Sequence, residues 1–280
     1  MPEGHTLYRL AGELDAAFAG GPVRVSSPQG RFAADAALLD GAVLLGATSA
    51  GKHLFVEFEG DRFVHVHLGL IGKFDVVALN GTPLPAPVGQ VRLRLVNATS
   101  YADLRGATQC DLVGADKKEA ILARLGQDPL DPAADPERVW RRISKSHRTI
   151  GELLMDQAVL AGVGNVYRAE ILFRHRQHPL RPGTSVRRKV FDAMWADLVE
   201  LMTDGVRTGR IDTVRPEHTP EAMGRAPRKD DHGGEVYVYR RTGQPCLVCG
   251  TSVRTQVLAG RNLFWCPKCQ PVYRSRAAVG

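Results

Sequence analysis

The chain has 280 residues, of which 44% are hydrophobic and 24% are charged, and its formal net charge is +7. This length predicts one large domain or two modest ones, and the apolar content is enough for real hydrophobic cores. No run of 18 apolar residues is present to cross a membrane, and the N-terminus lacks a basic and then apolar signal pattern, so we expect a cytoplasmic protein with five reduced cysteines.

The positive charge is concentrated in two segments of the C-terminal half. Between Arg138 and Lys189 there are 12 Lys or Arg and 3 Asp or Glu, and between Arg240 and Arg276 there are 7 Lys or Arg and no acidic residue. This uneven distribution favours a polyanionic partner over a basic face that is merely solvated.

The N-terminal half predicts one helix followed by strands. Apolar residues recur at helical spacing over residues 6–19, and the glycines at 20 and 21 end the helix. Four short strand-like runs follow, separated by turn residues, at 53–58, 62–68, 74–79 and 91–96. In the last run Val91, Leu93 and Leu95 share one face, and Arg92 and Arg94 the other. Closely spaced strands of this kind predict a sandwich or a barrel.

The C-terminal half changes to a helical period after the Pro- and Asp-rich stretch 128–136, which we expect to be a linker. Helices are predicted from Ile150 to Ala158, after an N-cap at Asn165, and along an apolar stripe from Phe191 to Met202 that Gly205 can end. Residues 215–235 have no period and predict a long mobile loop, and residues 235–240 predict a strand that leads to the cysteines.

Four cysteines form the strongest local signal. Two CxxC pairs, Cys246 with Cys249 and Cys266 with Cys269, enclose sixteen residues that predict a hairpin. This spacing is typical of a zinc ribbon, in which four thiolates close a tetrahedral site, so we expect one structural Zn²⁺ rather than a catalytic one. Cys110 stands alone and is expected to be an ordinary buried thiol.

The chain opens MPEGHTLYRL, which places Pro2 and Glu3 directly before the first predicted helix. We expect Met1 to be removed because residue 2 is small, which would leave Pro2 with a secondary amine. A neutral amine of this kind can attack an electrophilic carbon and form an iminium. Taken alone, however, these two residues more often have no catalytic role: Pro2 only favours the removal of Met1, and the carboxylate of Glu3 is solvated.

The second motif with a possible function is a break between two predicted helices. The residues from Ala161 to Gly164 contain two glycines, and a helix follows at Asn165. Glycines let the backbone approach a partner closely, and a helix N-terminus favours an anion. A phosphate-docking turn is therefore expected here, and a purely structural helical hairpin would be the default without the neighbouring basic residues from Arg141 to Arg148.

Short motifs occur together and in order along the chain: PEG at 2–4, GKHL at 51–54, HLGL at 67–70, GVGN at 162–165 and the two CxxC pairs. From Pro2 to Gln270 the chain therefore resembles the formamidopyrimidine-DNA glycosylase/endonuclease VIII family of DNA repair enzymes. The resemblance implies a two-lobed α+β fold, with an N-terminal helix and β-sandwich followed by a helix–two-turn–helix lobe that carries a zinc finger. We expect a catalytic domain at 1–127, a linker at 128–136, the helix–two-turn–helix domain at 137–239 and the zinc-finger segment at 240–280.

The resemblance also implies roles for individual residues. Pro2 matches the nucleophile that attacks C1′ of a flipped-out damaged nucleotide, and Glu3 matches the acid/base group that helps to open the sugar ring. Lys52 matches a lysine that contacts the phosphate beside the lesion. Asn165 and Arg261 match the phosphate-binding asparagine and the finger arginine.

Further matches concern the DNA duplex and the substrate. An enzyme that acts on a base must flip that base out of the duplex, because the base is inaccessible inside the base stack. Leu70 matches a family residue that intercalates into the gap left by the flipped base. Thr6 stands where many members have glutamate. DLRGAT at 103–108 stands where formamidopyrimidine enzymes often carry DPRRFG, so Arg105 is kept as a DNA contact but the aromatic wedge is missing. The match favours the endonuclease VIII side, whose members prefer oxidised pyrimidines.

The sequence thus predicts a bifunctional DNA glycosylase and AP lyase of base excision repair. We expect a monomer that acts on damaged double-stranded DNA by β- or β,δ-elimination and binds no membrane. Two alternatives stay open: a formamidopyrimidine-type enzyme for oxidised purines, and a catalytically silent DNA-damage binding protein. A binding module needs no free N-terminal proline, so Pro2, Glu3 and Lys52 favour an enzyme.

Overall fold

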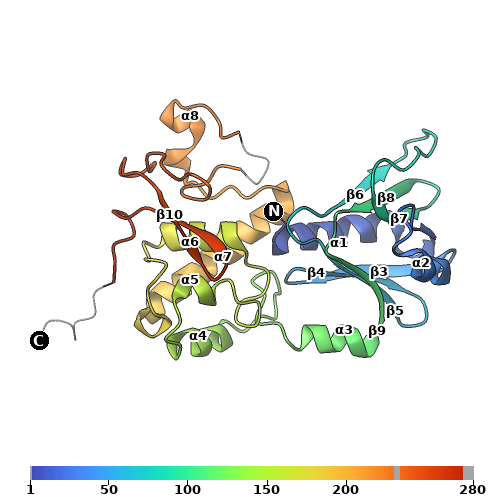
Figure 1. Ribbon diagram of the computed structural model, residues 1–280, viewed down its shortest axis with the longest axis horizontal. Coiled ribbons are helices and arrows are strands. Elements are labelled where there is room, and N and C mark those ends of the chain that lie inside the picture. Colours follow the sequence, from blue (N-terminus) through green and yellow to red (C-terminus); the bar gives the residue numbers. More distant parts are fainter. Residues whose placement is uncertain (1, 230–233, 274–280) are drawn as a thin grey trace, which may run out of the picture. The chain divides into compact units, whose positions relative to one another are not determined.

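The computed structural model describes residues 2–229 and 234–273. The chain divides between Leu125 and Gly126 into an N-terminal and a C-terminal unit (Figure 1). Among the described residues, no helix combines the length and the apolar character that crossing a membrane would require.

The N-terminal unit begins with helix α1 (Gly4–Phe18), as the periodicity predicts. Its apolar stripe, which includes Leu7, Leu10 and Leu14, is buried. At its start the amide of Glu3 donates a hydrogen bond to the hydroxyl of Thr6 at 3.4 Å. Thr6 therefore helps to cap the helix that carries the N-terminal residues.

Two antiparallel sheets follow, so the predicted sandwich is confirmed (Figure 1). The five-stranded sheet has the order β1 (Gly21–Pro22), β3 (Val43–Ala50), β4 (His53–Phe58), β5 (Arg62–His67) and β9 (Gln109–Gly114). The four-stranded sheet has the order β2 (Arg24–Ser26), β7 (Val91–Val96), β8 (Ser100–Arg105) and β6 (Lys73–Ala78). Two short helices, α2 (Ala33–Leu39) and α3 (Ala115–Leu122), complete the unit.

The core of this unit is formed by alternating strand residues from both sheets together with α1. Leu93 and Leu95 of β7 are fully buried, as their spacing predicts. Arg94 is a surprise on the opposite face, since it is only 5% exposed. Its guanidinium forms a two-point ion pair with Asp103 of β8, at 2.7 and 3.2 Å, and this pairing makes its burial tolerable.

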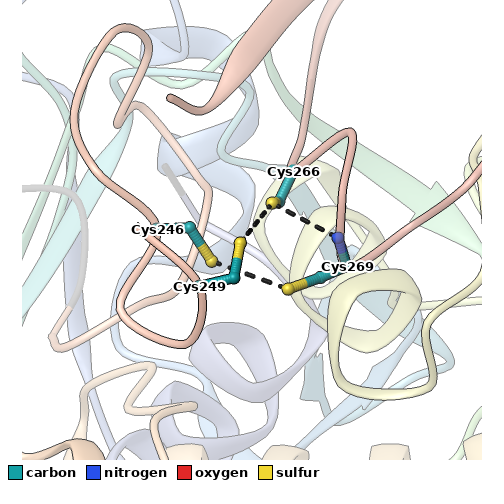
Figure 2. Close-up of side chains that lie close together, drawn as sticks. All are labelled: Cys246, Cys249, Cys266 and Cys269. Atoms are coloured by element: carbon teal, nitrogen blue, oxygen red, sulfur yellow. Dashed lines mark hydrogen bonds between the residues drawn. The ribbon is translucent and has the colours of Figure 1, made fainter. Parts of the chain in front are cut away.

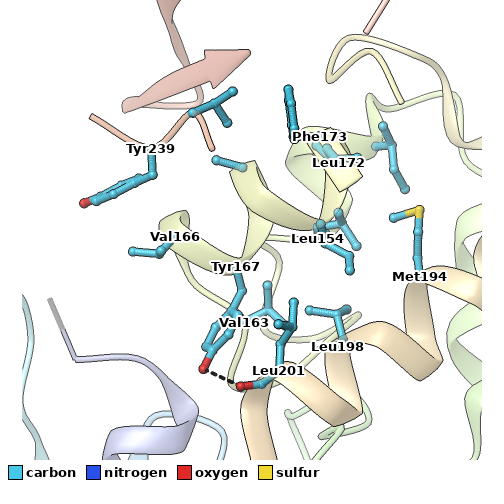
Figure 3. Packing of buried hydrophobic residues seen from close by; sticks show 14 of the residues in the cluster. Leu154, Val163, Val166, Tyr167, Leu172, Phe173, Met194, Leu198, Leu201 and Tyr239 are labelled. Atoms are coloured by element: carbon cyan, nitrogen blue, oxygen red, sulfur yellow. Dashed lines mark hydrogen bonds between the residues drawn. The ribbon is translucent and has the colours of Figure 1, made fainter. Parts of the chain in front are cut away.

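The C-terminal unit is helical, and its core surrounds α6 (Figure 3). Its elements are α4 (Pro136–Ser144), α5 (Ile150–Leu153), α6 (Asn165–Arg174), α7 (Arg188–Thr208), α8 (Pro220–Met223), the strands β10 (Arg254–Leu258) and β11 (Arg261–Trp265), and the 3₁₀ turns Gly183–Ser185 and Pro216–His218. The hairpin expected between the two CxxC pairs is confirmed by β10 and β11.

Three helix boundaries differ from the sequence prediction. Helix α5 has four residues instead of the predicted nine. The amide of Ala158 donates a hydrogen bond to the carboxylate of Asp156 at 3.0 Å, so the chain forms a turn there instead of continuing the helix. Helix α6 is capped by Gly164, with Asn165 as its first residue. Helix α7 continues past Gly205 and ends at Gly209, whose φ of +72° provides the left-handed cap.

The predicted strand at 235–240 is wrong. The amides of Tyr237, Val238 and Tyr239 donate to the carboxylate of Glu170 in α6 at 2.7, 2.9 and 2.8 Å, instead of to a neighbouring strand. The hydroxyl of Thr213 donates to the same carboxylate at 2.6 Å. Glu170 is fully buried, so these four donors replace its water shell.

The predicted loop at 215–235 contains a 3₁₀ turn and the one-turn helix α8. Part of that prediction, residues 230–233, lies outside the described residues. The same holds for residues 274–280 of the predicted zinc-finger segment.

Candidate functional site

The N-terminal residues lie at the start of α1. Pro2 is partly exposed, whereas Glu3 is fully buried. His5, in the first turn of α1, is also buried, and burial lowers its pKa to about 4. His5 is therefore neutral at physiological pH, and the buried carboxylate of Glu3 directly follows the residue whose amine we expect to react.

Lys52 occupies a two-residue turn between β3 and β4. Ala50 pairs with His53 across this turn, and Gly51 has a φ of +58°. A tight hairpin of this kind requires a positive φ at its first turn residue, which explains the glycine. The turn places Lys52 at the tip of a rigid hairpin in the N-terminal unit.

Next to Lys52 lies a group of three histidines that the sequence reading missed. Nδ1 of His53 and Nε2 of His65 are 2.9 Å apart, and the rings of His53 and His67 lie edge to face at 5.4 Å. Burial lowers the pKa of all three, to about 4 for His53, and the charge of Lys52 lowers that of His67 further. The group is thus neutral at physiological pH. The sequence contained a signal for this group: HVH at 65–67 lies on one predicted strand, and KH at 52–53 lies at the start of the neighbouring one.

Leu70 lies in the turn between β5 and β6, with its side chain 53% exposed. Its neighbour Ile71, which the sequence analysis did not select, is 78% exposed. The turn is tight, because the amide of Gly72 bonds the carbonyl of Leu68 at 3.0 Å and Gly69 has a φ of +69°. Two large apolar side chains are therefore held out into solvent.

Arg105 lies at the end of β8 and is engaged within its own unit. Its guanidinium bonds Asp103 at 2.7 Å, Asp75 at 3.1 Å and the carbonyl of Val88 at 2.9 Å. A DNA contact by Arg105 stays a prediction, and it would have to exchange or share these partners.

Asn165 and the finger hairpin are brought together in the C-terminal unit. The side-chain amide of Asn165, which is 5% exposed, donates to the carbonyl of Asn262 at 2.9 Å. The buried Arg168, one turn further along α6, donates to the same carbonyl at 3.0 Å and to the side-chain oxygen of Asn165. Arg261 precedes Asn262 and is exposed, next to the Ala259–Gly260 turn. Two predicted phosphate-binding residues are therefore neighbours.

The four cysteine sulfurs converge in the finger (Figure 2). All four lie within 4.8 Å of one another, with 3.8 Å between Cys246 and Cys269 and 3.4 Å between Cys249 and Cys266. A tetrahedral zinc with Zn–S bonds of about 2.3 Å requires sulfurs about 3.8 Å apart, so the donor set fits one zinc ion. Four thiolates leave no open coordination position, and the ion would fold the finger without taking part in chemistry.

Comparison with known proteins decides the family. The formamidopyrimidine-DNA glycosylase N-terminal domain matches residues 1–110, its H2TH domain matches residues 125–216, and the zinc finger found in FPG and IleRS matches residues 243–272. Endonuclease 8 1 of Mycobacterium tuberculosis is 54% identical over 275 residues, which cover 96% of this chain and 100% of that protein. The chain belongs to the formamidopyrimidine-DNA glycosylase/endonuclease 8 family. It is a DNA-binding enzyme of base excision repair, a DNA glycosylase with AP lyase activity, and its clustered cysteines form a structural zinc site.

The relatives carry both names of the family. Probable endonuclease 8 2 of Streptomyces coelicolor is 32% identical over 278 residues, covering 96% of this chain and 94% of that protein. Formamidopyrimidine-DNA glycosylase of Parasynechococcus marenigrum is 32% identical over 246 residues, covering 82% of this chain and 85% of that protein.

The fold also matches solved structures. The complex between Lactococcus lactis Fpg and DNA with an abasic site matches with a TM-score of 0.77 at 21% identity, covering 96% of this chain and all of that one. The complex of the same protein with DNA that contains an oxidised pyrimidine matches with a TM-score of 0.76 at 21% identity, covering 97% of this chain and all of that one. The α+β fold predicted from the sequence is confirmed.

Proposed function

We propose that this enzyme excises oxidised bases, with pyrimidines preferred, through an iminium formed at the amine of Pro2. The observation that supports this most directly is the burial of Glu3 immediately after Pro2. A carboxylate withdrawn from water beside a reactive amine is suited to proton transfer, since its charge is not screened by solvent.

The proposed reaction begins when the Pro2 nitrogen attacks C1′ of the damaged nucleotide. The bond between C1′ and the base breaks, the base leaves with a proton, and Glu3 protonates the ring oxygen so that the sugar opens to the iminium. The iminium acidifies the C2′ proton, and its removal expels the 3′ phosphate by β-elimination. A second elimination can expel the 5′ phosphate, and water then hydrolyses the iminium and restores the amine.

The remaining residues are proposed to hold the DNA. Lys52, at the tip of its hairpin, would contact the phosphate beside the lesion, and Asn165 with Arg261 would contact further phosphates. Leu70 would fill the gap left by the flipped base, and the exposed Ile71 beside it is suited to the same role.

The preference for pyrimidines rests on two observations. The relative with 54% identity is named endonuclease 8 1, and DLRGAT at 103–108 lacks the aromatic residue of many formamidopyrimidine enzymes. Relatives named formamidopyrimidine-DNA glycosylase support the alternative, a preference for oxidised purines. We further propose that the enzyme acts as a monomer in the cytoplasm, where it is associated with the nucleoid through DNA.

Borohydride trapping tests the proposal. With duplexes that contain an abasic site, thymine glycol or 8-oxoguanine, the processed enzyme should give a covalent adduct that mass spectrometry places on Pro2. A protein that retains Met1 should bind the same duplexes but form no adduct, because its Pro2 nitrogen is a tertiary amide. An adduct on Lys52 or another lysine would refute the mechanism, and faster excision of 8-oxoguanine than of thymine glycol would favour the purine alternative.

Glu3→Gln separates the two steps. Base excision should fall by about 10²–10⁴-fold, since this is the usual loss for a removed acid/base group. An abasic site already present should still form an iminium with Pro2. Equal losses on damaged-base and abasic duplexes would refute this separation, since Glu3 would then be needed even where no base has to leave.

The proposed phosphate contact of Arg261 is tested by salt. Arg261→Ala should weaken duplex binding and reduce the slope of log K against log salt by about one unit, because one counterion fewer is released. Its effect should be the same for different base sequences. An unchanged slope would remove Arg261 from the contact surface.

A further inference from the structure

Three histidines lie on the face of the five-stranded sheet that points away from the core of the N-terminal unit. His53 is the first residue of β4, directly after Lys52, and His65 and His67 belong to β5. The register of these two strands makes His53 and His67 neighbours across them. None of the three histidines has a role in the reaction proposed above, although they adjoin the hairpin that carries Lys52.

The ring of His53 is held in one orientation. His65, which is only 1% exposed, stacks on both Phe55 and His53, with ring centroids 4.8 and 5.1 Å away. Nδ1 of His53 lies 2.9 Å from Nε2 of His65, so the two side chains share a hydrogen bond. Since Nδ1 of His53 faces His65, Nε2 on the other side of the ring faces away from it. His53 is partly exposed, and its Nε2 has no hydrogen-bond partner among the residues that the structure describes.

The shared hydrogen bond fixes the tautomer of His53. Burial lowers the pKa of both rings, so each is neutral at physiological pH and carries one proton. Nδ1 of His65 is buried and has no hydrogen-bond partner among the described residues. If that atom carried the proton of His65, an N–H donor would be buried without an acceptor, an arrangement that is rare in proteins. The proton of His65 therefore lies on Nε2 and is donated to Nδ1 of His53, whose own proton lies on its Nε2.

His67 is fixed in the same tautomer by the backbone. The amide of Gly69 donates to its Nδ1 at 3.1 Å, so the proton of the neutral ring lies on Nε2. The rings of His53 and His67 lie edge to face, with centroids 5.4 Å apart. The charge of Lys52 acts on His67, so the ammonium group lies nearby. Two neutral N–H donors and one cationic donor are therefore close together at the end of one hairpin.

An N–H donor whose ring is already fixed is suited to hold a phosphate oxygen, because little conformational freedom is lost on binding. We propose that His53 is a further DNA-binding residue, which donates its Nε2–H to a phosphate of the DNA backbone at the Lys52 hairpin, and that the buried His65 is its positioning residue. This inference rests on the phosphate contact proposed for Lys52. A neutral donor releases no counterion, so the contact adds affinity without adding salt dependence.

The affinity for a duplex with a stable abasic-site analogue (tetrahydrofuran), measured over a range of salt concentrations, tests the contact. In H53N the amide reaches the place of Nδ1 and can bond His65, but no group replaces Nε2. The affinity of H53N should fall about tenfold, the usual loss for a hydrogen bond to a charged group, with an unchanged slope of log K against log salt. In H53Q the longer side chain returns a donor near the place of Nε2 and should restore part of the affinity. K52Q, in contrast, should flatten the slope by about one unit.

T48N is the matched control, because Thr48 is exposed and the pairing of β3 with β4 places it on the same face of the hairpin. T48N should bind the duplex like the wild type, and thermal melting verifies the fold of every variant. The imidazole ¹⁵N shifts of the free protein should show His53 protonated on Nε2 and not on Nδ1. A proton on Nδ1, an affinity of H53N equal to that of T48N, a flattened slope in H53N, or no recovery of affinity in H53Q would each overturn the proposal.

Failure of this inference can be told apart from failure of the proposed reaction. At saturating DNA, H53N should still give the borohydride-trapped adduct on Pro2, since His53 takes no part in the chemistry. If H53N binds like the wild type and the adduct lies on Pro2, the contact of His53 is overturned and the reaction stands. If the adduct lies on another residue but H53N still binds about tenfold more weakly with an unchanged slope, the reaction is overturned and the contact stands.

Discussion

The two units are stabilised in different ways. In the N-terminal unit an apolar core fills the space between two sheets, and Leu54, Val56 and Phe58 of one strand are each fully buried. The N-terminal unit also buries some polar groups, such as the Arg94–Asp103 pair, but the described part of the C-terminal unit buries more of them. Glu170 and Arg168, which are at most 1% exposed, are among these groups, and four converging cysteines are added to them.

The comparison shows what each arrangement depends on. Apolar contacts are not directional, so a core of this kind changes gradually when one side chain is trimmed. A buried carboxylate with four donors, or a metal with four ligands, depends on every partner. The C-terminal unit should therefore be the more sensitive to exchange of a single atom.

Loss of zinc should have the largest effect. Cys249→Ser, or removal of the metal by a chelator, should unfold the finger and abolish DNA affinity, because metal binding and folding are coupled in a closed Cys₄ site. The N-terminal unit should stay folded, as hydrogen exchange measured by mass spectrometry can show. Cys110→Ser is the matched control and should keep one zinc per chain. A metal-free protein that binds DNA normally would contradict the structural role of the ion.

Glu170→Gln should destabilise the C-terminal unit by about 3 kcal/mol or more, although the side chain keeps its size. Glutamine removes the charge and turns an NH₂ group toward amides that donate, so buried donors lose their acceptor. Denaturant unfolding measures the change in the free energy of unfolding. Glu152→Gln, which alters the half-exposed cap of α5, should cost about 1 kcal/mol. Equal effects of the two changes would show that the contacts of Glu170 contribute little.

Leu54→Val should destabilise the N-terminal unit by about 1–2 kcal/mol, since it removes one buried methylene and leaves a small cavity. The effect should be confined to that unit in hydrogen exchange. If it exceeded that of Glu170→Gln, the contrast between a graded core and an all-or-none polar network would be wrong.

The histidines of the N-terminal unit should give the smallest effect, and only in acid. The pKa of an unperturbed histidine is about 6.5. Burial lowers the pKa of His53 to about 4 and also lowers the pKa of His65, although the charge of Asp111 opposes this second shift. The unfolded state therefore binds protons first, so the stability that is complete above pH 6.5 is lost as the pH falls toward 4. The melting temperature of H53Q/H65Q should fall less steeply over this interval than that of the wild type. Exchange of the exposed His147 for glutamine should leave the slope unchanged.

Features set by neighbouring residues could be predicted from the sequence. The stripe of α1, the alternation in β7 and the two CxxC pairs each depend on residues close together in the chain, and all three are present in the structure. Gly51 fits the same local rule, since it supplies a positive φ where a turn requires one, whereas the helix end predicted at Gly205 lies at Gly209.

Features set by distant partners could not. Arg94 has the spacing of a surface residue, and its burial depends on Asp103 of the neighbouring strand. The histidine group forms only when two strands pair, and the link from Asn165 to Asn262 joins residues 97 positions apart.

The segment 237–239 shows the reason most clearly. Its alternating Tyr and Val residues predict a strand, because the pattern reports only that these side chains become buried. The backbone conformation was decided by Glu170, 67 to 69 positions earlier, whose carboxylate takes the hydrogen bonds that a neighbouring strand would have taken. Local sequence thus determined which residues leave water, and the tertiary structure determined which partner satisfies the polar groups that are buried with them.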